Sequence, residues 1–571
     1  MEDNSKEVGS ESESNSGSMQ DILQLSNRST RNMNFKPSYR IRKLKNKGAL
    51  LILVWNCLAM STFRYLIGYP NVFHPNSYYI YAYSIIIIIW GLTLPIAGWL
   101  ADVCLTRFKV IRWSILIMWI ASVLVVASSV LSQISVVEHY YHNSAKKYVT
   151  MLLLIVMSLA FGGYQANVVL FGIDQLQDAS TDEITSFISW CVSTYFSSGL
   201  FIKFIYMCLG EAYNSLLPEF LVCICLTVMA VLTLFCDRIF LKEPITQNPF
   251  QLIYKVIKYA IKTKHPRCRS AFTYCEDNLP SRIDFGKRKY GGPFTTEEVE
   301  DVKTFLRMLV VIFITAAMAY GALSLYYLEF QLIITHEDDS YDTLFHFDRF
   351  HDSNWITLII IELTFYFSGT VLILLYEFIF YPLLRNHVPY MQSDRWKIAV
   401  GIFSQIAKVI VLMTIDLIAR HSYIEHNNAT IQCIFMEQSG ILNSNFSMRW
   451  MVLAQLFNSI SVITSVIGAF EFICSQSPYS MRGLLFGATY CCIMLYFLVG
   501  YGIMKPFTKL STSISWGAGI ISCEFWYLLL ILVILILNSI MVCILSKWYK
   551  NRKREDVLPN EQVFAERYYT Y

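Results

Sequence analysis

The chain has 571 residues and a formal net charge of +4 at pH 7. Its composition is 55% hydrophobic and only 15% charged, with a mean hydropathy of +0.44. Soluble domains carry about 25% charged residues, so this balance excludes a set of soluble domains and predicts an integral membrane protein embedded in a lipid bilayer. The small net charge argues against a nucleic-acid partner, which would require a clustered basic face.

The N-terminal segment differs from the rest of the chain. Residues 1–47 begin acidic and Ser-rich and turn basic over residues 40–47. A segment with so few apolar residues cannot bury a core, so we expect a disordered tail. The basic cluster at its end is typical of the cytoplasmic flank of a first membrane helix.

The 15 cysteines form no spaced framework. Most, such as Cys57, Cys191 and Cys491, lie inside apolar runs, where they behave as small hydrophobes. No CxxC pair or Cys/His ligand spacing occurs, and we therefore expect no metal site. The sequence also has no P-loop, GxSxG, HExxH or dinucleotide fingerprint, so we expect neither a cofactor nor an enzyme.

Apolar runs long enough to cross a bilayer dominate the remaining sequence. A spanning helix needs about 20 mostly apolar residues, and about twelve runs meet this length: 49–68, 78–100, 110–132, 148–170, 187–209, 217–240, 306–331, 355–381, 398–420, 450–473, 484–504 and 518–546. A long polar segment divides them into six and six. We therefore predict an all-α membrane protein with a six-helix bundle over 48–240, a cytoplasmic linker over 241–305, a second six-helix bundle over 306–546 and a cytoplasmic tail over 547–571. A two-halved carrier gives this pattern.

The charges of the loops predict the orientation. Alternate loops and the C-terminal tail are rich in Lys and Arg, which favours a cytoplasmic location for both termini. Two Asn-x-Ser/Thr sequons, at Asn428 and Asn445, fall in one loop of the opposite side and are candidate glycosylation sites. The sequence leaves open whether the membrane is the plasma membrane or an endolysosomal one.

The linker contains two helix signals. The first is an amphipathic pattern around Asn248–Lys262, and the second is a capping box that begins at Thr295 and reaches Glu298. We expect an ordinary solvated loop with helical pieces here.

Four motifs in chain order resemble those of the proton-coupled oligopeptide transporter (POT, or PTR) family of the major facilitator superfamily. They are GWLADVCLTRFKVI (98–111), GGYQANVVLFGIDQ (162–175), GPFTTEEVEDVK (292–303) and EFICSQSPYSMR (471–482). Four matches in order, at the predicted helix ends, are a specific signal. The resemblance implies the major facilitator fold, a peptide-like substrate and coupling to protons.

The first motif also indicates a gate on physical grounds. Asp102 ends one predicted helix, and the cations Arg107 and Lys109 begin the next. Such charges can pair across the cytoplasmic face and latch one state of a rocking carrier. The alternative is plain positive-inside charge.

Departures from the family pattern concern the charged residues that the family uses. The first-helix ExxER is Asn56–Met60 here, and the fourth-helix Lys is Gln165. In the family these charges are implicated in proton coupling and in binding the peptide carboxylate. We expect Asn56 and Gln165 to line the cavity in place of the charged groups, and the sequence leaves proton coupling open.

Several ionisable residues lie in predicted membrane helices, where charge is expensive and usually functional. Glu471 ends the run that begins near Trp450, and the resemblance implies that it holds the amine of a solute. The alternative is that it lies at the cytoplasmic end and pairs with Arg482. Glu362 and Lys408 are candidates for a proton or charge relay, in which Lys408 pairs with Glu362 or Glu471. Lys203 is expected to snorkel to the interface.

The predicted function is secondary transport of small peptides or related zwitterionic solutes, including di- and tripeptides or histidine-like molecules, by alternating access. An alternative from another class is a carrier-derived scaffold or sensor that no longer transports.

Overall fold

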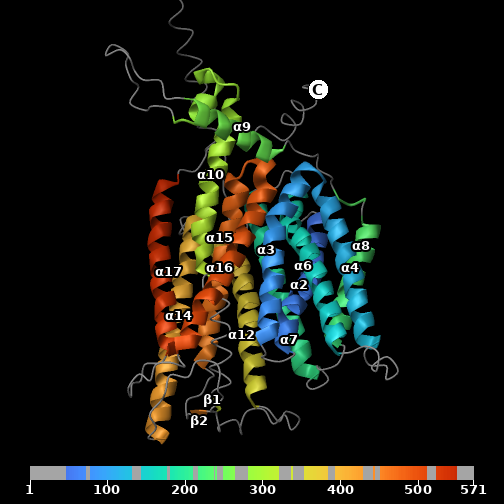
Figure 1. The fold of residues 1–571 in the computed structure, drawn as a ribbon, viewed down its shortest axis with the longest axis vertical. Coiled ribbons are helices and arrows are strands. Elements are labelled where there is room, and N and C mark those ends of the chain that lie inside the picture. The colour runs from blue at the N-terminus through green and yellow to red at the C-terminus, as the bar shows by residue number, and fades with distance from the viewer. Residues whose placement is uncertain are drawn as a thin grey trace, which may run out of the picture. The chain divides into compact units, whose positions relative to one another are not determined.

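A computed structural model describes residues 47–72, 77–131, 143–176, 181–209, 217–236, 238–240, 248–263, 281–319, 336–337, 353–383, 393–427, 442–443, 450–510 and 523–549. Figure 1 shows these segments as a set of long helices that run side by side.

Two groups of six long helices account for most of the described chain. The first group is α2 (Lys47–Val72), α3 (Ser77–Val103), α4 (Arg107–Leu131), α6 (Asn143–Asp174), α7 (Thr181–Leu209) and α8 (Leu217–Phe235). The second is α10 (Thr296–Ala316), α12 (Ser353–Leu375), α14 (Asp394–Asn427), α15 (Met451–Gln476), α16 (Arg482–Leu510) and α17 (Cys523–Trp548). We call these groups the first and second bundles. Each of the twelve predicted apolar runs overlaps one of these helices.

Length and composition qualify ten of the described helices as membrane spans. The other two, Lys47–Thr62 and Glu219–Phe235, are apolar but shorter than the criterion within the described residues. Large apolar side chains face outward on many of these helices, for example Leu92, Ile96 and Trp113. An outward apolar surface on a long helix is what a lipid environment requires. The interior holds rings such as Trp55, Phe161 and Phe486.

Short elements complete the described chain. A π-helical turn, η6 (Tyr376–Phe380), continues α12, and two-residue strands β1 (His336–Glu337) and β2 (Leu442–Asn443) pair in parallel. The remaining short elements are the helical turns η2 (Asp284–Gly286), η3 (Arg288–Tyr290), η4 (Ala317–Ala319) and η9 (Tyr479–Met481).

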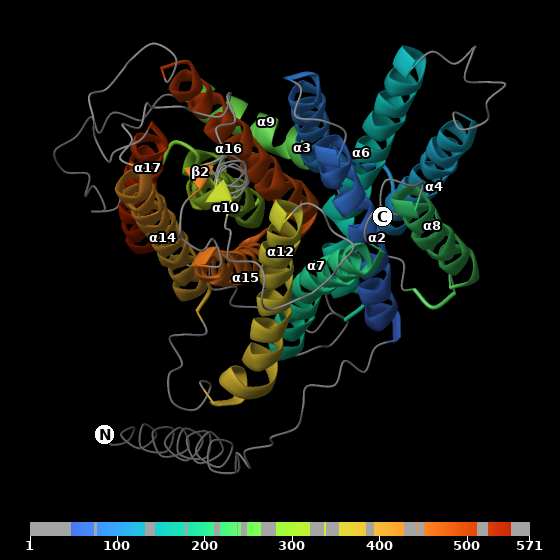
Figure 2. The same cartoon turned by 90° about the horizontal axis from the view of Figure 1, so that it is seen from below.

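The two bundles meet at two places. Helix α3 packs against α16, and α7 packs against both α12 and α15, as Figure 2 shows. The approach of α3 to α16 depends on glycine, because a Cβ on Gly98 would lie 2.2 Å from the carbonyl oxygen of Gly483. A Cβ on Gly487 would similarly lie 2.4 Å from the carbonyl oxygen of Leu94. Any larger residue would force these helices apart.

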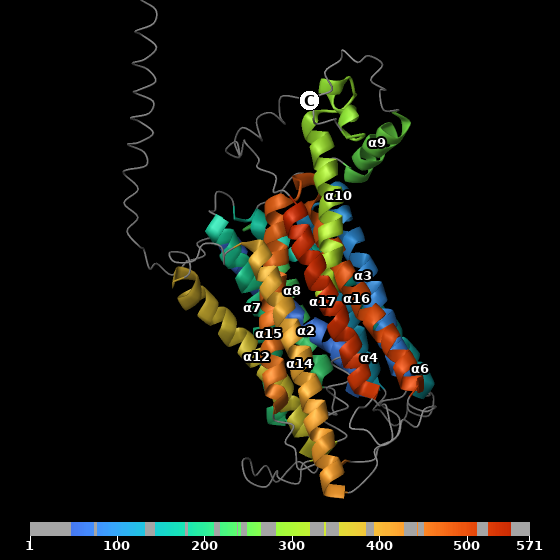
Figure 3. The same cartoon turned by 90° about the vertical axis from the view of Figure 1, so that its left-hand side faces the viewer.

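The linker forms the predicted amphipathic helix, α9 (Pro249–Lys262). Asn248 caps it by accepting a hydrogen bond from the N–H of Phe250 at 3.1 Å, and Pro249 occupies the first turn, where no N–H is needed. The Phe250 ring packs on Trp99 of α3, with centroids 5.8 Å apart. We call the end of the bundles that carries Trp99, α9 and the start of α10 the linker end (Figures 1 and 3).

The predicted capping box at the start of α10 is confirmed. Thr295 accepts a hydrogen bond from the N–H of Glu298, whose carboxylate accepts one from the N–H of Thr295 at 2.8 Å. From there α10 runs beside α16 and α17 (Figure 3).

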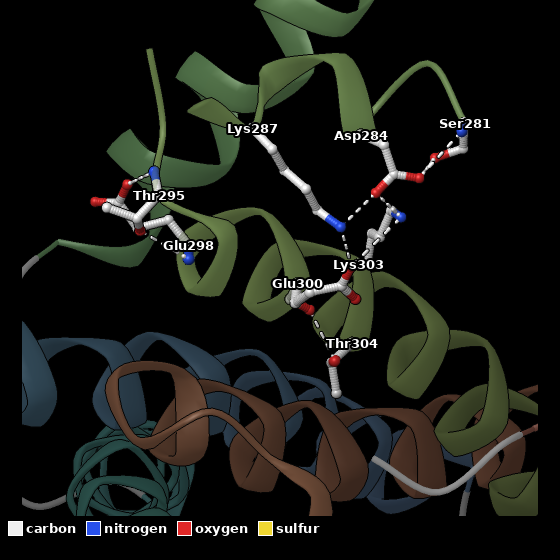
Figure 4. Close-up of polar contacts among 8 residues, drawn as sticks. All are labelled: Ser281, Asp284, Lys287, Thr295, Glu298, Glu300, Lys303 and Thr304. Atoms are coloured by element: carbon white, nitrogen blue, oxygen red, sulfur yellow. Dashed lines mark hydrogen bonds and ion pairs between the residues drawn. The ribbon is translucent and has the colours of Figure 1, made fainter. Parts of the chain in front are cut away.

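Four charged residues before and within α10 form a closed ion cluster (Figure 4). Lys287 lies 2.7 Å from Asp284 and 2.5 Å from Glu300, and Lys303 contacts the same two carboxylates. Burial disfavours ionisation of Asp284, but hydrogen bonds from Lys287, Lys303 and Ser281 outweigh it and hold the pKa of this carboxyl well below its ordinary value. The cluster is therefore a stable part of the linker, which is more ordered here than an ordinary solvated loop.

Candidate functional site

A central cavity of about 240 Å³ lies between the two bundles. The first bundle lines it from α2, α3, α6 and α7, and the second from η4, α14, α15 and α16. The lining combines aromatic rings and methionines with neutral polar groups, the latter being Asn56, Gln165, Tyr195, Gln405, Asn458, Ser461, Ser465 and Tyr490. No Asp, Glu, Lys or Arg occurs among the described residues of this lining. The cavity can therefore hold a small molecule through hydrogen bonds and ring contacts.

Asn56 reaches the cavity from α2 and is only 2% exposed. Its Nδ2 donates to the hydroxyl of Thr194 at 2.6 Å and to the carbonyl oxygen of Cys191 at 3.3 Å. The carbonyl can only accept, so this contact fixes the orientation of the amide. The Oδ1 atom is left buried with no hydrogen-bond partner among the described residues.

Gln165 reaches the cavity from α6 and joins the two bundles. Its Nε2 donates to the hydroxyl of Tyr490 on α16, 2.9 Å away. Its Oε1 is buried and likewise has no partner in the described part of the chain. The structure thus brings Asn56 and Gln165 to one cavity, as the sequence predicts.

Glu471 lies beside this cavity but not on its lining, although its neighbour Phe470 is a lining residue. Both of its carboxylate oxygens accept hydrogen bonds from Nζ of Lys397, at 2.7 and 2.5 Å, and both side chains are buried. We expected Lys408 or Arg482 to pair with Glu471, and this expectation is wrong. Arg482 instead donates to the Ser477 hydroxyl at 3.3 Å. Lys397 lies in the first turn of α14, which begins at Asp394. From the sequence it is expected only to contribute to the positive charge of the cytoplasmic face.

Glu362 pairs with Lys203, which corrects the expectation for Lys203. Lys203 of α7 does not snorkel alone to the interface but reaches across to α12 of the second bundle. Lys408, the expected partner of Glu362, is 3% exposed inside α14.

The linker end holds a set of contacts that bind the bundles together. Asp102, at the end of α3, accepts hydrogen bonds from Arg107, at 3.2 and 2.9 Å, and from the backbone N–H of Gly483, at 2.9 Å. Arg107 also pairs with Asp174 at the end of α6. Asp102 therefore links α3 to the N-terminus of α16, where the helix dipole favours a carboxylate.

A second link at the same end joins α7 to the end of α12. The hydroxyl of Tyr381 donates to Asp182 at 2.8 Å, and Ser186 donates to Glu377 at 3.0 Å. Lys109, which we expected beside Asp102 and Arg107, is exposed and lies apart from these contacts. The sequons Asn428 and Asn445 lie outside the described residues.

Comparisons with known proteins find a family model and related sequences. A family model described as PTR2, POT family, matches residues 108–323. Solute carrier family 15 member 3 of Mus musculus is 23% identical over 440 residues, which cover 72% of this chain and 74% of the relative. The same protein of Rattus norvegicus is 22% identical over 449 residues, with the same shares of 72% and 74%. The chain is therefore similar to the POT family over residues 108–323.

Solved structures of transporters agree in fold with this chain. The POT family transporter PepTSo is 14% identical and matches with a TM-score of 0.61, over 89% of this chain and 99% of that one. An auto-inhibited POT family peptide transporter is 11% identical and has a TM-score of 0.60, over 89% and 98% of the two chains. The chain therefore has the major facilitator fold.

Against the charged residues of the family motifs that this chain resembles, the neutral lining of the cavity is its unusual feature. Pattern matching finds Asn56 and Gln165 because they replace charged residues of family motifs. It does not find Tyr490, Asp174 or Lys397, whose roles depend on contacts between distant helices. Asp174 does stand in the quoted FGIDQ segment, and an acid at a helix end is the signal that could have pointed to it.

Proposed function

We propose that this chain moves a small peptide-like solute across a membrane by alternating access. The observation that carries the proposal is the cavity of about 240 Å³, to which both bundles contribute. A site at the interface of two rocking halves is where a carrier of this fold binds its solute. A related POT family transporter, with a TM-score of 0.54, has been solved in complex with 5-aminolevulinic acid, a small molecule that supports a similar size of solute here.

Two sets of contacts are suited to serve as gates. At the linker end, Asp102 holds the N-terminus of α16, and Arg107 neutralises Asp102. On the outer halves of α7 and α12, Lys203 and Glu362 hold the bundles together. In the proposed cycle these contacts break in turn, so that the cavity opens to one side at a time.

That Glu471 binds the amine of a solute stays a prediction. In this structure Lys397 binds both oxygens of its carboxylate. A solute amine would first have to displace Lys397, which is buried and would then keep only Asp394 as a nearby carboxylate. Glu471 therefore cannot bind an amine in this state without rearrangement of α14 against α15.

We further propose that transport does not require a proton gradient. The described lining of the cavity has no carboxyl group, and Glu471 and Glu362 are each paired with a lysine. Uptake into proteoliposomes should be unchanged when an ionophore collapses the gradient. A steep dependence of uptake on the outside pH would contradict this.

The proposed orientation places both termini in the cytoplasm and Asn428 and Asn445 on the opposite side. Treatment of the cell-expressed chain with a deglycosylating enzyme should increase its gel mobility. Substitution of both asparagines by Gln should abolish that shift. A shift that survives both substitutions would overturn the assignment of these sites.

Uptake of labelled dipeptides, tripeptides and histidine tests the proposed transport. Proteoliposomes that contain the full chain should accumulate at least one of these solutes above empty liposomes. If none of these solutes and no uncharged peptide is taken up, the transport proposal fails, and a scaffold or sensor function becomes the better account. Thermal stabilisation of the purified chain by the transported solute would show that it binds the folded protein.

A further inference from the structure

The cavity lining points to a particular kind of solute. Its polar groups are amides and hydroxyls, and its rings include Trp90, Phe161 and Phe470. A buried charge is stable only when it is paired, whereas a neutral polar group needs only hydrogen bonds. The chemistry of this lining therefore suits a neutral molecule with apolar side groups.

Asn56 adds a specific requirement. Its Nδ2 is held by Thr194 and Cys191, so the amide cannot rotate to offer a donor to the cavity. Its Oδ1 is buried and unpartnered, and an unmet acceptor costs about 1–3 kcal/mol. A solute N–H that donates to Oδ1 removes this cost.

Gln165 repeats the pattern on the neighbouring helix α6. Nε2 is committed to Tyr490, and the buried Oε1 has no partner among the described residues. The cavity thus offers two hydrogen-bond acceptors, one from α2 and one from α6. A molecule with two N–H groups and no ionised group can satisfy both.

The charges next to the cavity do not change this conclusion. Lys397 lies 2.5 Å from Glu471, the Asp394 carboxyl contacts this pair, and none of the three side chains lines the cavity. A zwitterionic dipeptide would bring an ammonium and a carboxylate into a cavity whose described lining has no counter-charge. Loss of hydration costs several kcal/mol for each unpaired ion, so the zwitterion is disfavoured relative to a neutral amide of similar size.

We propose that the cavity between Asn56 and Gln165 selects an uncharged, amide-containing solute, such as a cyclic dipeptide, over a zwitterionic linear peptide. Asn56 Oδ1 and Gln165 Oε1 accept the two amide N–H groups, and the rings pack on the side chains. This inference rests on the proposed function and names the substrate class of the same site.

The test compares two probes on the purified full chain. They are the cyclic dipeptide of phenylalanine and alanine and the linear phenylalanyl-alanine, which have the same side chains but differ in charge and in ring closure. Isothermal titration should give a dissociation constant about tenfold or more lower for the cyclic probe, which corresponds to about 1.4 kcal/mol or more. Equal or tighter binding of the linear dipeptide overturns this inference but leaves the proposed transport standing.

Variants assign the preference to the cavity. Asn56→Leu should weaken binding of the cyclic probe by about tenfold, because one hydrogen bond is lost. Asn538→Leu is the matched control, since Asn538 is also a buried asparagine but lies on α17 and does not line the cavity. Equal losses in the two variants would overturn the assignment to Asn56.

Gln165→Lys provides a readout that does not depend on loss of binding. A cation at this position supplies the counter-charge for a carboxylate, so the preference should move toward the linear dipeptide by about tenfold. An unchanged preference in a folded variant would overturn the role of Gln165. If neither probe binds and neither is transported, and no other peptide is taken up, the proposed function fails together with this inference.

Discussion

The carboxylate of Asp102 accepts a hydrogen bond from the backbone N–H of Gly483, 2.9 Å away. This bond joins the last turn of α3 to the first turn of α16 across the interface between the bundles. It forms only because glycines let the two helices approach closely, and Arg107 neutralises the buried carboxylate at the same time. The link between α3 and α16 through Asp102 thus depends on backbone geometry as much as on charge.

Substitution of Gly98 tests this close approach. A Cβ there would lie 2.2 Å from the carbonyl oxygen of Gly483, so Gly98→Ala should destabilise the chain by about 1–3 kcal/mol, the usual cost of overpacking. Thermal melting of the purified protein measures this. Gly502→Ala on α16 is the matched control, because its Cβ meets nothing within 4 Å, and it should be neutral or stabilising. Equal melting temperatures for Gly98→Ala and Gly502→Ala would contradict the packing described for α3 and α16.

The pair Lys203–Glu362 is expected to couple α7 to α12 energetically. Both side chains are partly buried, so removal of one charge leaves the other without compensation. Lys203→Met and Glu362→Gln should each lower the free energy of unfolding. The double variant should lose about 0.5–3 kcal/mol less than the sum of the two single losses. The exposed Lys109 offers a control, since Lys109→Met should change stability by no more than about 0.5 kcal/mol. Strictly additive effects would show that the pair does not join the bundles.

The linker cluster should be stable across a wide pH range. Because contacts with Lys287, Lys303 and Ser281 lower the pKa of Asp284 in the folded chain, its contribution is full above the unfolded pKa of about 3.9 and is lost as the pH falls through the lower folded value. Contacts with Asp284 and Glu300 outweigh burial and raise the pKa of Lys287, so its contribution is lost only above about pH 10.4. Hydrogen exchange over residues 281–303, corrected for its intrinsic pH dependence, should show protection from about pH 5 to 9.

Asp284→Asn should remove much of this protection at pH 7, because two lysines lose a shared partner. Glu297→Gln changes an exposed carboxylate in the same region and should cost only a few tenths of a kcal/mol. Protection that is the same in both variants would mean that the ion cluster does not hold the linker.

Local patterns predicted much of the fold. The twelve apolar runs, the helix at Pro249–Lys262 and the capping box at Thr295 are each encoded within about 25 consecutive residues, so the sequence alone indicates them. The pairing of Asp102 with Arg107 is also local, because five positions separate them.

Contacts between distant helices could not be predicted in the same way. Lys397 and Glu471 are 74 positions apart, and only the packing of α14 on α15 brings them together. The contacts of Lys203 with Glu362 and of Gln165 with Tyr490 could not be predicted for the same reason. A buried acid in a sequence indicates that a partner exists, but several lysines at membrane depth compete for that role, and helix rotation decides among them.

The most direct measurement of the central claim is counterflow in proteoliposomes that contain the full chain. Vesicles loaded with the unlabelled cyclic dipeptide of phenylalanine and alanine are diluted into a trace of the labelled compound. If the cavity carries neutral peptide-like solutes, the label should accumulate transiently above equilibrium, strongly with the unmodified chain and with Asn538→Leu, and weakly with Asn56→Leu. No accumulation above empty vesicles, or the same accumulation with Asn56→Leu as with Asn538→Leu, would contradict the account.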